Sequence, residues 1–304
     1  MKWIKWAFAE AGFRALSMTL LKVIGNLSQG LLQIILSTFV IGSIQLIVAA
    51  IVIKVNNLRF LTVKRLVIGS IIFGITAFIN TVIPFMAFVR DANITVYTFI
   101  TLLAIIPGAI IDRIWFQEQL IMRQYLGIFV AIGAGWLILK TPNLSELLNL
   151  PLWVWLAGAN AIFLSIGQGI TRAIKEVNPW VKNFWGGLTT SILCLVVFSI
   201  YNQQIAKILM SPETWLILFW SIAIAFIVIG IWTFNVITYR DGSSVYAKHV
   251  VVSGVFMVLI ILIGLFIFKE QITIVQSMGI IMYFIAFVLV NNEVWKRATN
   301  MHLD

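Results

Sequence analysis

Two oppositely charged residues interrupt the first long apolar stretch of the chain, residues 3–24. Glu10 and Arg14 are four positions apart, so on a helix they share one face, which Ser17 continues. A charge at the centre of a membrane helix costs about 2.5–3.5 kcal/mol, so each needs a partner or a wet cavity. Two interpretations stay open: a self-neutralising pair that fixes the helix in a bundle, or a cavity-facing carboxylate that can bind a proton or an amine.

A second charged group lies in the apolar stretch 244–267, where Lys248 and His249 are followed by Ser253. Lys248 is about one turn from the expected helix end, so its ammonium either extends to the membrane surface or faces a cavity with Arg14. His249 and Ser253 share a helix face. A lone helix histidine is more often a hydrogen-bonded packing residue than a proton carrier.

Neutral polar residues form stripes at helical spacing in other apolar stretches. Hydrogen bonds between helices account for some of them, but four stripes in two matching halves exceed what packing usually requires. We therefore expect part of this set to bind a solute, with Trp232 as a flat stacking surface. The candidates are Gln33, Asn80, Asn160, Gln168, Trp232 and Asn235.

Catalytic, metal and cofactor motifs are missing from the sequence. Cys194 is the only cysteine, His249 and His302 are the only histidines, and no HExxH or Gly-rich phosphate motif is present. We expect no catalytic residue, no metal and no cofactor.

The elements that carry these residues are expected to be membrane helices. Apolar residues make up 61% of the chain and charged residues 11%, which points to lipid as the surrounding solvent. Ten apolar stretches are each long enough to cross a bilayer of about 30 Å and do not alternate as barrel strands do. They are 3–24, 30–53, 66–88, 94–111, 123–139, 152–172, 180–201, 213–238, 244–267 and 273–292. The first is expected to be a retained helix and not a cleaved signal, because it is long and contains charges.

Basic residues predict the orientation. If the N-terminus is cytoplasmic, 14 Lys and Arg residues fall in inside segments, Lys182 among them, and 5 fall in outside segments. This bias predicts that both termini are cytoplasmic. The net charge of +10 is dispersed over short segments, so we expect no nucleic-acid partner.

One short sequence pattern occurs twice, 152 positions apart. Residues 116–127 read FQEQLIMRQYLG and residues 268–279 read FKEQITIVQSMG. The pattern predicts two five-helix repeats, residues 1–150 and 151–304. Because five is odd, the second repeat is inverted in the membrane, as in many transporters. We interpret Glu118, Gly127, Glu270 and Gly279 as architecture: each glutamate caps the helix that follows it, and each glycine permits close helix packing.

Ten helices in a five-plus-five arrangement, with E-x5-Q-x2-G after an apolar helix, resemble the drug/metabolite transporter superfamily of the EamA type. The resemblance covers nearly the whole chain, and Pro107 fits a proline common in the fourth helix of that family. Leu259, at the matching position of the second half, departs from the pattern. The resemblance implies export or exchange of small metabolites across the cytoplasmic (inner) membrane, without specifying one.

The leading functional hypothesis is a secondary transporter that works by alternating access, driven by the solute gradient or by protons. Arg14 and Lys248 against a single Glu10 favour an anionic or zwitterionic solute. The alternatives are a flippase for lipids or lipid-linked sugars, an integral membrane enzyme and a non-transporting scaffold. A polar groove open to lipid would favour the flippase, and a surface cluster of His, Asp or Ser would favour the integral membrane enzyme.

Overall fold

The computed structural model describes residues 2–118, 121–139, 150–201, 208–243 and 245–290, and within these ranges all regular structure is helical. The helices of the first half are α1 (Lys2–Leu27), α2 (Leu31–Val55), α3 (Lys64–Phe88), α4 (Ile94–Leu102), α5 (Ile105–Trp115) and α6 (Met122–Leu139). Those of the second half are α8 (Leu152–Ala173), α9 (Pro179–Ile200), α11 (Pro212–Arg240), α12 (Val245–Phe266) and α13 (Ile274–Val290).

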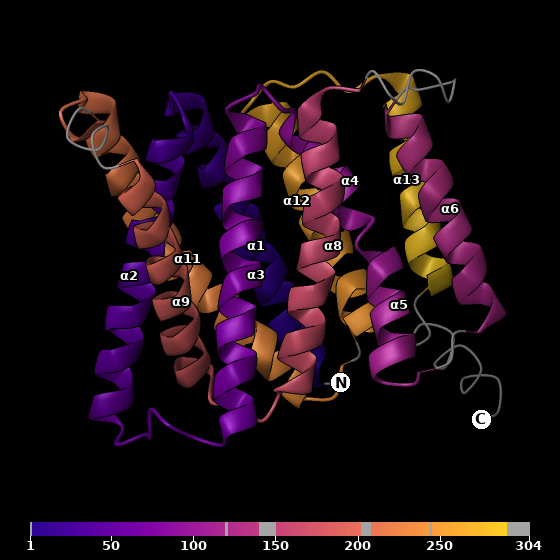
Figure 1. Cartoon of the computed structure of the whole chain (residues 1–304). Helices are drawn as coiled ribbons and strands as arrows, with labels where there is room; N and C mark the ends of the chain where they lie inside the picture. The colour runs from indigo at the N-terminus through magenta and orange to yellow at the C-terminus, as the bar shows by residue number, and fades with distance from the viewer. Residues whose placement is uncertain (1, 119–120, 140–149, 202–207, 244, 291–304) are drawn as a thin grey trace.

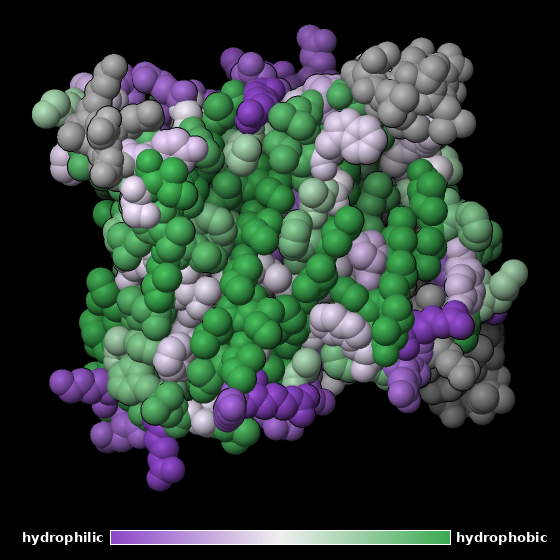
Figure 2. Space-filling model, in the orientation of Figure 1, coloured by the Kyte–Doolittle hydropathy of each residue, from purple (hydrophilic) through white to green (hydrophobic). Residues whose placement is uncertain are grey.

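In the part of the chain that the structure describes, seven helical segments are long and apolar enough to cross a membrane, counting α4 and α5 as one segment, Ile94–Trp115. The others are α2, α3, α6, α8, α9 and α11. Figure 2 shows the corresponding surface: a broad apolar belt covers the middle of this face, and hydrophilic side chains gather along its upper and lower edges. The chain is therefore a multi-pass membrane protein by length and composition of its helices.

The stretch predicted as one helix over 94–111 is broken after Leu102, and α5 begins at Ile105. Pro107 weakens the helix at this point, because it has no N–H to donate to the carbonyl of Leu103 and its ring clashes with that carbonyl. Ser165 of α8 donates a hydrogen bond of 2.7 Å to the carbonyl of Ala104, which satisfies one backbone group at the break. At the corresponding place in the second half stands Leu259, and α12 is continuous there.

Helices of the two halves pack against one another throughout the bundle. The packed pairs across the halves include α2 with α9, α3 with α8, α1 with α11, and α6 with α13. Figure 1 shows α6 and α13 side by side at one edge of the molecule and α2, α9 and α11 at the other, with α1, α3, α8 and α12 between them. The middle of the bundle is thus built jointly by both halves.

Gly279 allows the close contact between α13 and α6. A Cβ atom at this position would lie 2.6 Å from Cγ1 of Ile138 and 2.9 Å from the carbonyl oxygen of Ala134. Both distances are shorter than a carbon atom tolerates, so only glycine fits without a shift of α6. Gly127 is buried in α6.

The turns before α6 and α13 have the same backbone geometry. Gln117 and Lys269 have φ angles of 55° and 53°, in the left-handed region. The next residue in each turn donates a hydrogen bond to the carbonyl six positions earlier: Glu118 N donates to Asp112 O at 3.1 Å, and Glu270 N donates to Gly264 O at 2.9 Å. Each turn therefore ends the preceding helix with a left-handed residue and the same backbone hydrogen bond.

Among the described residues, neither glutamate of these turns accepts a hydrogen bond from the helix that follows it, which differs from the sequence-based interpretation. Gln124 caps the start of α6, since its Oε1 accepts from Ile121 N at 2.8 Å. Gln276 does the same for Thr273 N at 3.0 Å before α13. Glu270 instead caps α4, in the other half of the chain: its carboxylate accepts from Ile94 N at 2.7 Å and from Thr95 N at 3.2 Å.

Each glutamate also pairs with a cation from the opposite half. Lys22, near the end of α1, lies 2.8 Å from Glu270, and Arg172, near the end of α8, pairs with Glu118. Arg172 also lies 2.6 Å from Asp112, whose carboxylate accepts from Val245 N at the start of α12. The two clusters therefore lie at opposite ends of α12, a 22-residue helix of about 33 Å.

Candidate functional site

A cavity of about 150 Å³ lies between α1, α3, α4, α8, α11 and α12. Its lining on α1 runs from Glu10 to Leu21, a distance of about 16 Å along the helix. One end is polar, with side chains from α1, α8, α11 and α12. The other end is mostly apolar, with Met18, Leu21, Pro84 and Ile224 among its walls. The cavity therefore suits a small solute with a charged group and an apolar part.

Glu10 is at the centre of the polar end and is fully buried. Arg14 donates to its Oε1 from Nε at 2.9 Å and from Nη2 at 2.8 Å. Lys248 Nζ lies 2.8 Å from Glu10 Oε2. That contact is an ion pair without good hydrogen-bond direction, because Oε2 accepts no hydrogen bond. One carboxylate thus pairs with two cations, one from each half of the chain, and offsets only one of their two charges.

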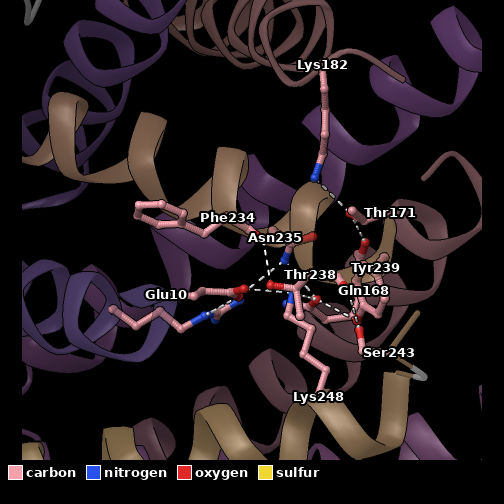
Figure 3. Close-up of polar contacts among 12 residues, drawn as sticks. Glu10, Gln168, Thr171, Lys182, Phe234, Asn235, Thr238, Tyr239, Ser243 and Lys248 are labelled. Atoms are coloured by element: carbon pink, nitrogen blue, oxygen red, sulfur yellow. Dashed lines mark hydrogen bonds and ion pairs between the residues drawn. The ribbon is translucent and has the colours of Figure 1, made fainter. Parts of the chain in front are cut away.

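Gln168 of α8 connects the charged group to α11. Its Oε1 accepts from Asn235 Nδ2 at 2.8 Å, from the Tyr239 hydroxyl at 2.8 Å and from Lys248 Nζ at 2.9 Å. Asn235 Nδ2 also lies 3.3 Å from Glu10 Oε1. Figure 3 shows these side chains directed toward one another from separate helices. The network fixes the orientation of each member and joins both halves at the polar end.

Several oxygens at the cavity have no hydrogen-bond partner. Among the described residues, they are Oδ1 of Asn80, of Asn160 and of Asn235. A buried polar atom without a partner costs about 1–3 kcal/mol, so such atoms gather where water or a ligand can satisfy them. These atoms are consistent with a cavity that receives a hydrogen-bonding molecule.

Nine of the eleven predicted candidates line this one cavity: Glu10, Arg14, Asn80, Asn160, Gln168, Trp232, Asn235, Lys248 and Ser253. Lys248 is 2% exposed and does not extend to the membrane surface. Glu10 therefore combines the features of both open interpretations: its carboxylate pairs with Arg14, and it also lines the cavity.

The other two candidates are Gln33, which is not among the described lining residues of this cavity, and His249. Gln33 lies between α2 and α11, where its Nε2 donates to Thr214 Oγ1 at 3.1 Å and its Oε1 accepts from Gln29 N. Hydrogen bonding between helices accounts for it fully. His249 is part of α12, and its side chain lies outside the described residues.

Trp232 forms part of an aromatic wall with Phe73, which the sequence analysis did not single out. The two rings meet edge to face, 4.7 Å apart with an interplanar angle of 85°. Gly186 of α9 makes room for the indole, since a Cβ there would lie 2.5 Å from Trp232 Cζ3. The wall separates the cavity from α9.

Lys182 is the main residue that the sequence analysis placed wrongly. It was counted with the charges of the inside segments, although the predicted stretch 180–201 contains it, and in the structure it is fully buried within α9. One signal was present: Gly186 and Thr190 follow at steps of four, so Lys182 belongs to a face of small residues that packs against other helices. When Lys182 is left out of the count, the predicted inside segments still hold more Lys and Arg residues than the outside segments.

The cavity carries a positive net charge, because Arg14, Lys248 and Glu10 are its charged lining residues. In a low-dielectric environment this imbalance favours an anionic group near the two cations. Among the residues that the structure describes, no group of three or more His, Cys, Asp or Glu side chains could hold a metal ion. The arrangement is suited to binding a solute.

Comparison with known proteins gives a fold and no family. No family model and no curated protein sequence match the chain. Chains of solved structures do match. One, described as "Crystal structure of protein", is 14% identical and superimposes with a TM-score of 0.63, over 96% of this chain and 98% of that chain. This similarity concerns the fold alone.

Proposed function

We propose that this chain is a secondary transporter of small organic solutes in the cytoplasmic membrane, and that the central cavity is its solute site. One observation carries the proposal: eight polar or charged side chains and Trp232, all predicted from apolar stretches of both halves, line a single cavity inside a helical bundle. Polar groups are costly inside a membrane, and they are retained where a solute pathway needs them. The solute is an anion or a zwitterion with a carboxylate.

The proposed architecture is ten membrane spans in two inverted five-helix repeats, with both termini cytoplasmic. It is supported by the two left-handed turns at Gln117 and Lys269, which share the same backbone geometry 152 positions apart. It is also supported by the two cross-half ion pairs at opposite ends of α12. Alternating access then requires the two halves to exchange conformations, so that one end of the cavity opens while the other closes.

Reconstitution into proteoliposomes tests the proposal. Vesicles with the purified protein are loaded with a panel of labelled small carboxylates, amines and neutral metabolites, and exchange against the same unlabelled compounds is measured. We expect saturable exchange of a carboxylate-bearing solute. The variant Lys248→Gln should weaken its apparent affinity by about 30-fold or more, since removal of one buried charge partner costs about 2–5 kcal/mol.

A matched control uses Val258→Ala, a neutral change on the same helix at an exposed position outside the cavity lining. This variant should exchange the solute with an affinity within a few-fold of the parent. Exchange restricted to quaternary ammonium compounds, or an unchanged affinity in folded Lys248→Gln, would refute the anionic solute. Vesicles that exchange none of the panel above the protein-free background would count against transport.

A further inference from the structure

Lys182 is a buried cation that the cavity network leaves out. Its side chain is fully buried, and its ammonium donates to Thr171 Oγ1 at 2.8 Å. The same ammonium lies 3.5 Å from the centre of the Phe73 ring. Within the described part of the chain, no carboxylate forms an ion pair with it. An ammonium has three N–H donors, so the hydroxyl uses one of them.

Its position continues the polar end of the cavity. Thr171 follows Gln168 by three residues on α8, which places both on one face, about 4.5 Å apart along the axis. Gln168 accepts from Lys248, and Thr171 accepts from Lys182. Figure 3 shows Lys182 reaching Thr171 from outside the group around Glu10 and Gln168. The two lysines thus form a short series that leads toward the C-terminal end of α8.

The aromatic wall of Phe73 and Trp232 lies between Lys182 and the cavity that Lys248 lines. Phe73 lines the cavity, and its ring is also the one that faces the Lys182 ammonium. Phe73 and Trp232 meet edge to face, so a rotation of either ring would change the barrier between the cavity and Lys182.

A buried ammonium at the position of Lys182 is energetically unfavourable. It lies in the first turns of α9, where the helix dipole is positive and disfavours a cation. A hydroxyl and a ring face offset part of the cost of burying an ammonium, but less than a carboxylate would. Packing alone would be served by an apolar side chain of similar length. An anion that contacts the ammonium during the transport cycle would offset the cost of its burial and account for a lysine at this position.

We propose that Lys182 is a second anion-binding station, which the solute's anionic group reaches after it leaves Arg14 and Lys248 on the way to the α8–α9 end of the bundle. This inference rests on the proposed function. A series of weak sites, in place of one tight site, lets a charged solute enter and still leave. Lys248 then determines affinity in the cavity, and Lys182 determines the rate of passage between the cavity and that end.

The test measures whether anions are attracted to this position, without any need to know the solute. A cysteine is introduced as Thr171→Cys in a Cys194→Ala background, because Cys194 is the only native cysteine. The protein in membrane vesicles is treated with anionic sulfonatoethyl methanethiosulfonate and, separately, with cationic trimethylammonioethyl methanethiosulfonate. The measured quantity is the ratio of the two modification rates.

We expect the anionic reagent to be preferred, and the preference to fall at least about tenfold when Lys182→Gln is added, as loss of one nearby charge at low dielectric predicts. Lys182→Arg should retain it. The control is Gln117→Cys in an exposed turn, whose ratio should not respond to Lys182→Gln. The proposed anion site at Lys182 would be refuted if the ratio of the two modification rates at Thr171→Cys did not change when Lys182→Gln is added. It would also be refuted if neither reagent modified the thiol from either side of the membrane.

Exchange kinetics provide a second readout that does not need the cysteine. Lys182→Gln should slow solute exchange about tenfold or more while it leaves the apparent affinity within about threefold. A purely structural lysine would instead lower stability and leave exchange per folded molecule unchanged. If no solute is exchanged but the thiol ratio depends on Lys182, the transport proposal fails and the anion site stands. If exchange occurs with an unchanged ratio and rate, only the station fails.

Discussion

Lys22 and Glu270 are 248 positions apart in the chain, yet the Lys22 ammonium lies 2.8 Å from the Glu270 carboxylate, which also caps α4. Arg172 and Glu118 form the related pair at the other end of α12. The two clusters differ in one respect: Arg172 has a second carboxylate, Asp112, whereas Gly264 stands at the corresponding position near Glu270. The end that holds Lys22 therefore depends on a single carboxylate.

This difference predicts unequal effects of the same substitution. Glu270→Gln should lower the free energy of unfolding by about 3–5 kcal/mol, since it leaves Lys22 buried without an anion. Glu118→Gln should cost no more than about 1 kcal/mol, because Glu118 is 40% exposed and Arg172 retains Asp112. The measurement is unfolding in detergent by SDS titration. Equal losses in the two variants would contradict the asymmetry.

Glu10 should be more important for stability than either of its cationic partners. Glu10→Gln leaves Arg14 and Lys248 without their carboxylate, and we expect a loss of about 3–5 kcal/mol. Adding Lys248→Met should recover part of that loss, because one buried charge is removed and Arg14 is partly exposed. Thermal unfolding followed by size-exclusion chromatography checks this order. Glu10→Gln with wild-type stability would show that the network carries no net stabilisation.

The packing of α13 on α6 gives a prediction with an internal control. Gly279→Ala should destabilise the protein by about 1–3 kcal/mol, because the added Cβ would meet the Ala134 carbonyl at 2.9 Å. Gly158→Ala should be neutral or slightly stabilising, since nothing lies within 4 Å of its Cβ position and alanine favours a helix. SDS titration of both variants is the measurement. A larger loss in Gly158→Ala than in Gly279→Ala would refute this account of the contact.

The sequence predicted the helical elements well, because each is defined by its own residues. The apolar stretch 30–53 became α2 (Leu31–Val55), and 66–88 became α3 (Lys64–Phe88). Polar residues within such stretches were also informative, since lipid makes them costly wherever they are not paired. That is why most of the polar candidates line one cavity.

The sequence could not predict partners between distant helices. Periodicity tells which residues share a helix face, but not which helix that face contacts. Glu270 was therefore expected to cap its own next helix and instead caps α4. Lys182 was counted with the charges of the inside segments because it lies near the start of the predicted stretch 180–201, but it is buried. The break before α5 was missed for a different reason: Pro107 is compatible with either a kink or a complete break, and packing decides between them.

The inverted arrangement predicts that the two repeated turns lie on opposite sides of the membrane. Gln117 and Lys269 suit this test, because both are exposed, both have left-handed φ angles and both immediately precede the repeated glutamates. Gln117→Cys and Lys269→Cys are made separately in the Cys194→Ala background and exposed to a membrane-impermeant maleimide in intact cells and in inverted vesicles. Lys269→Cys should react from outside the cell, and Gln117→Cys should react only in inverted vesicles. The matched backbone geometry means that a difference in labelling reports the side of the membrane and not local structure. If both cysteines react from the same side, the halves are not inverted, and alternating access by exchange of the two halves loses its structural basis.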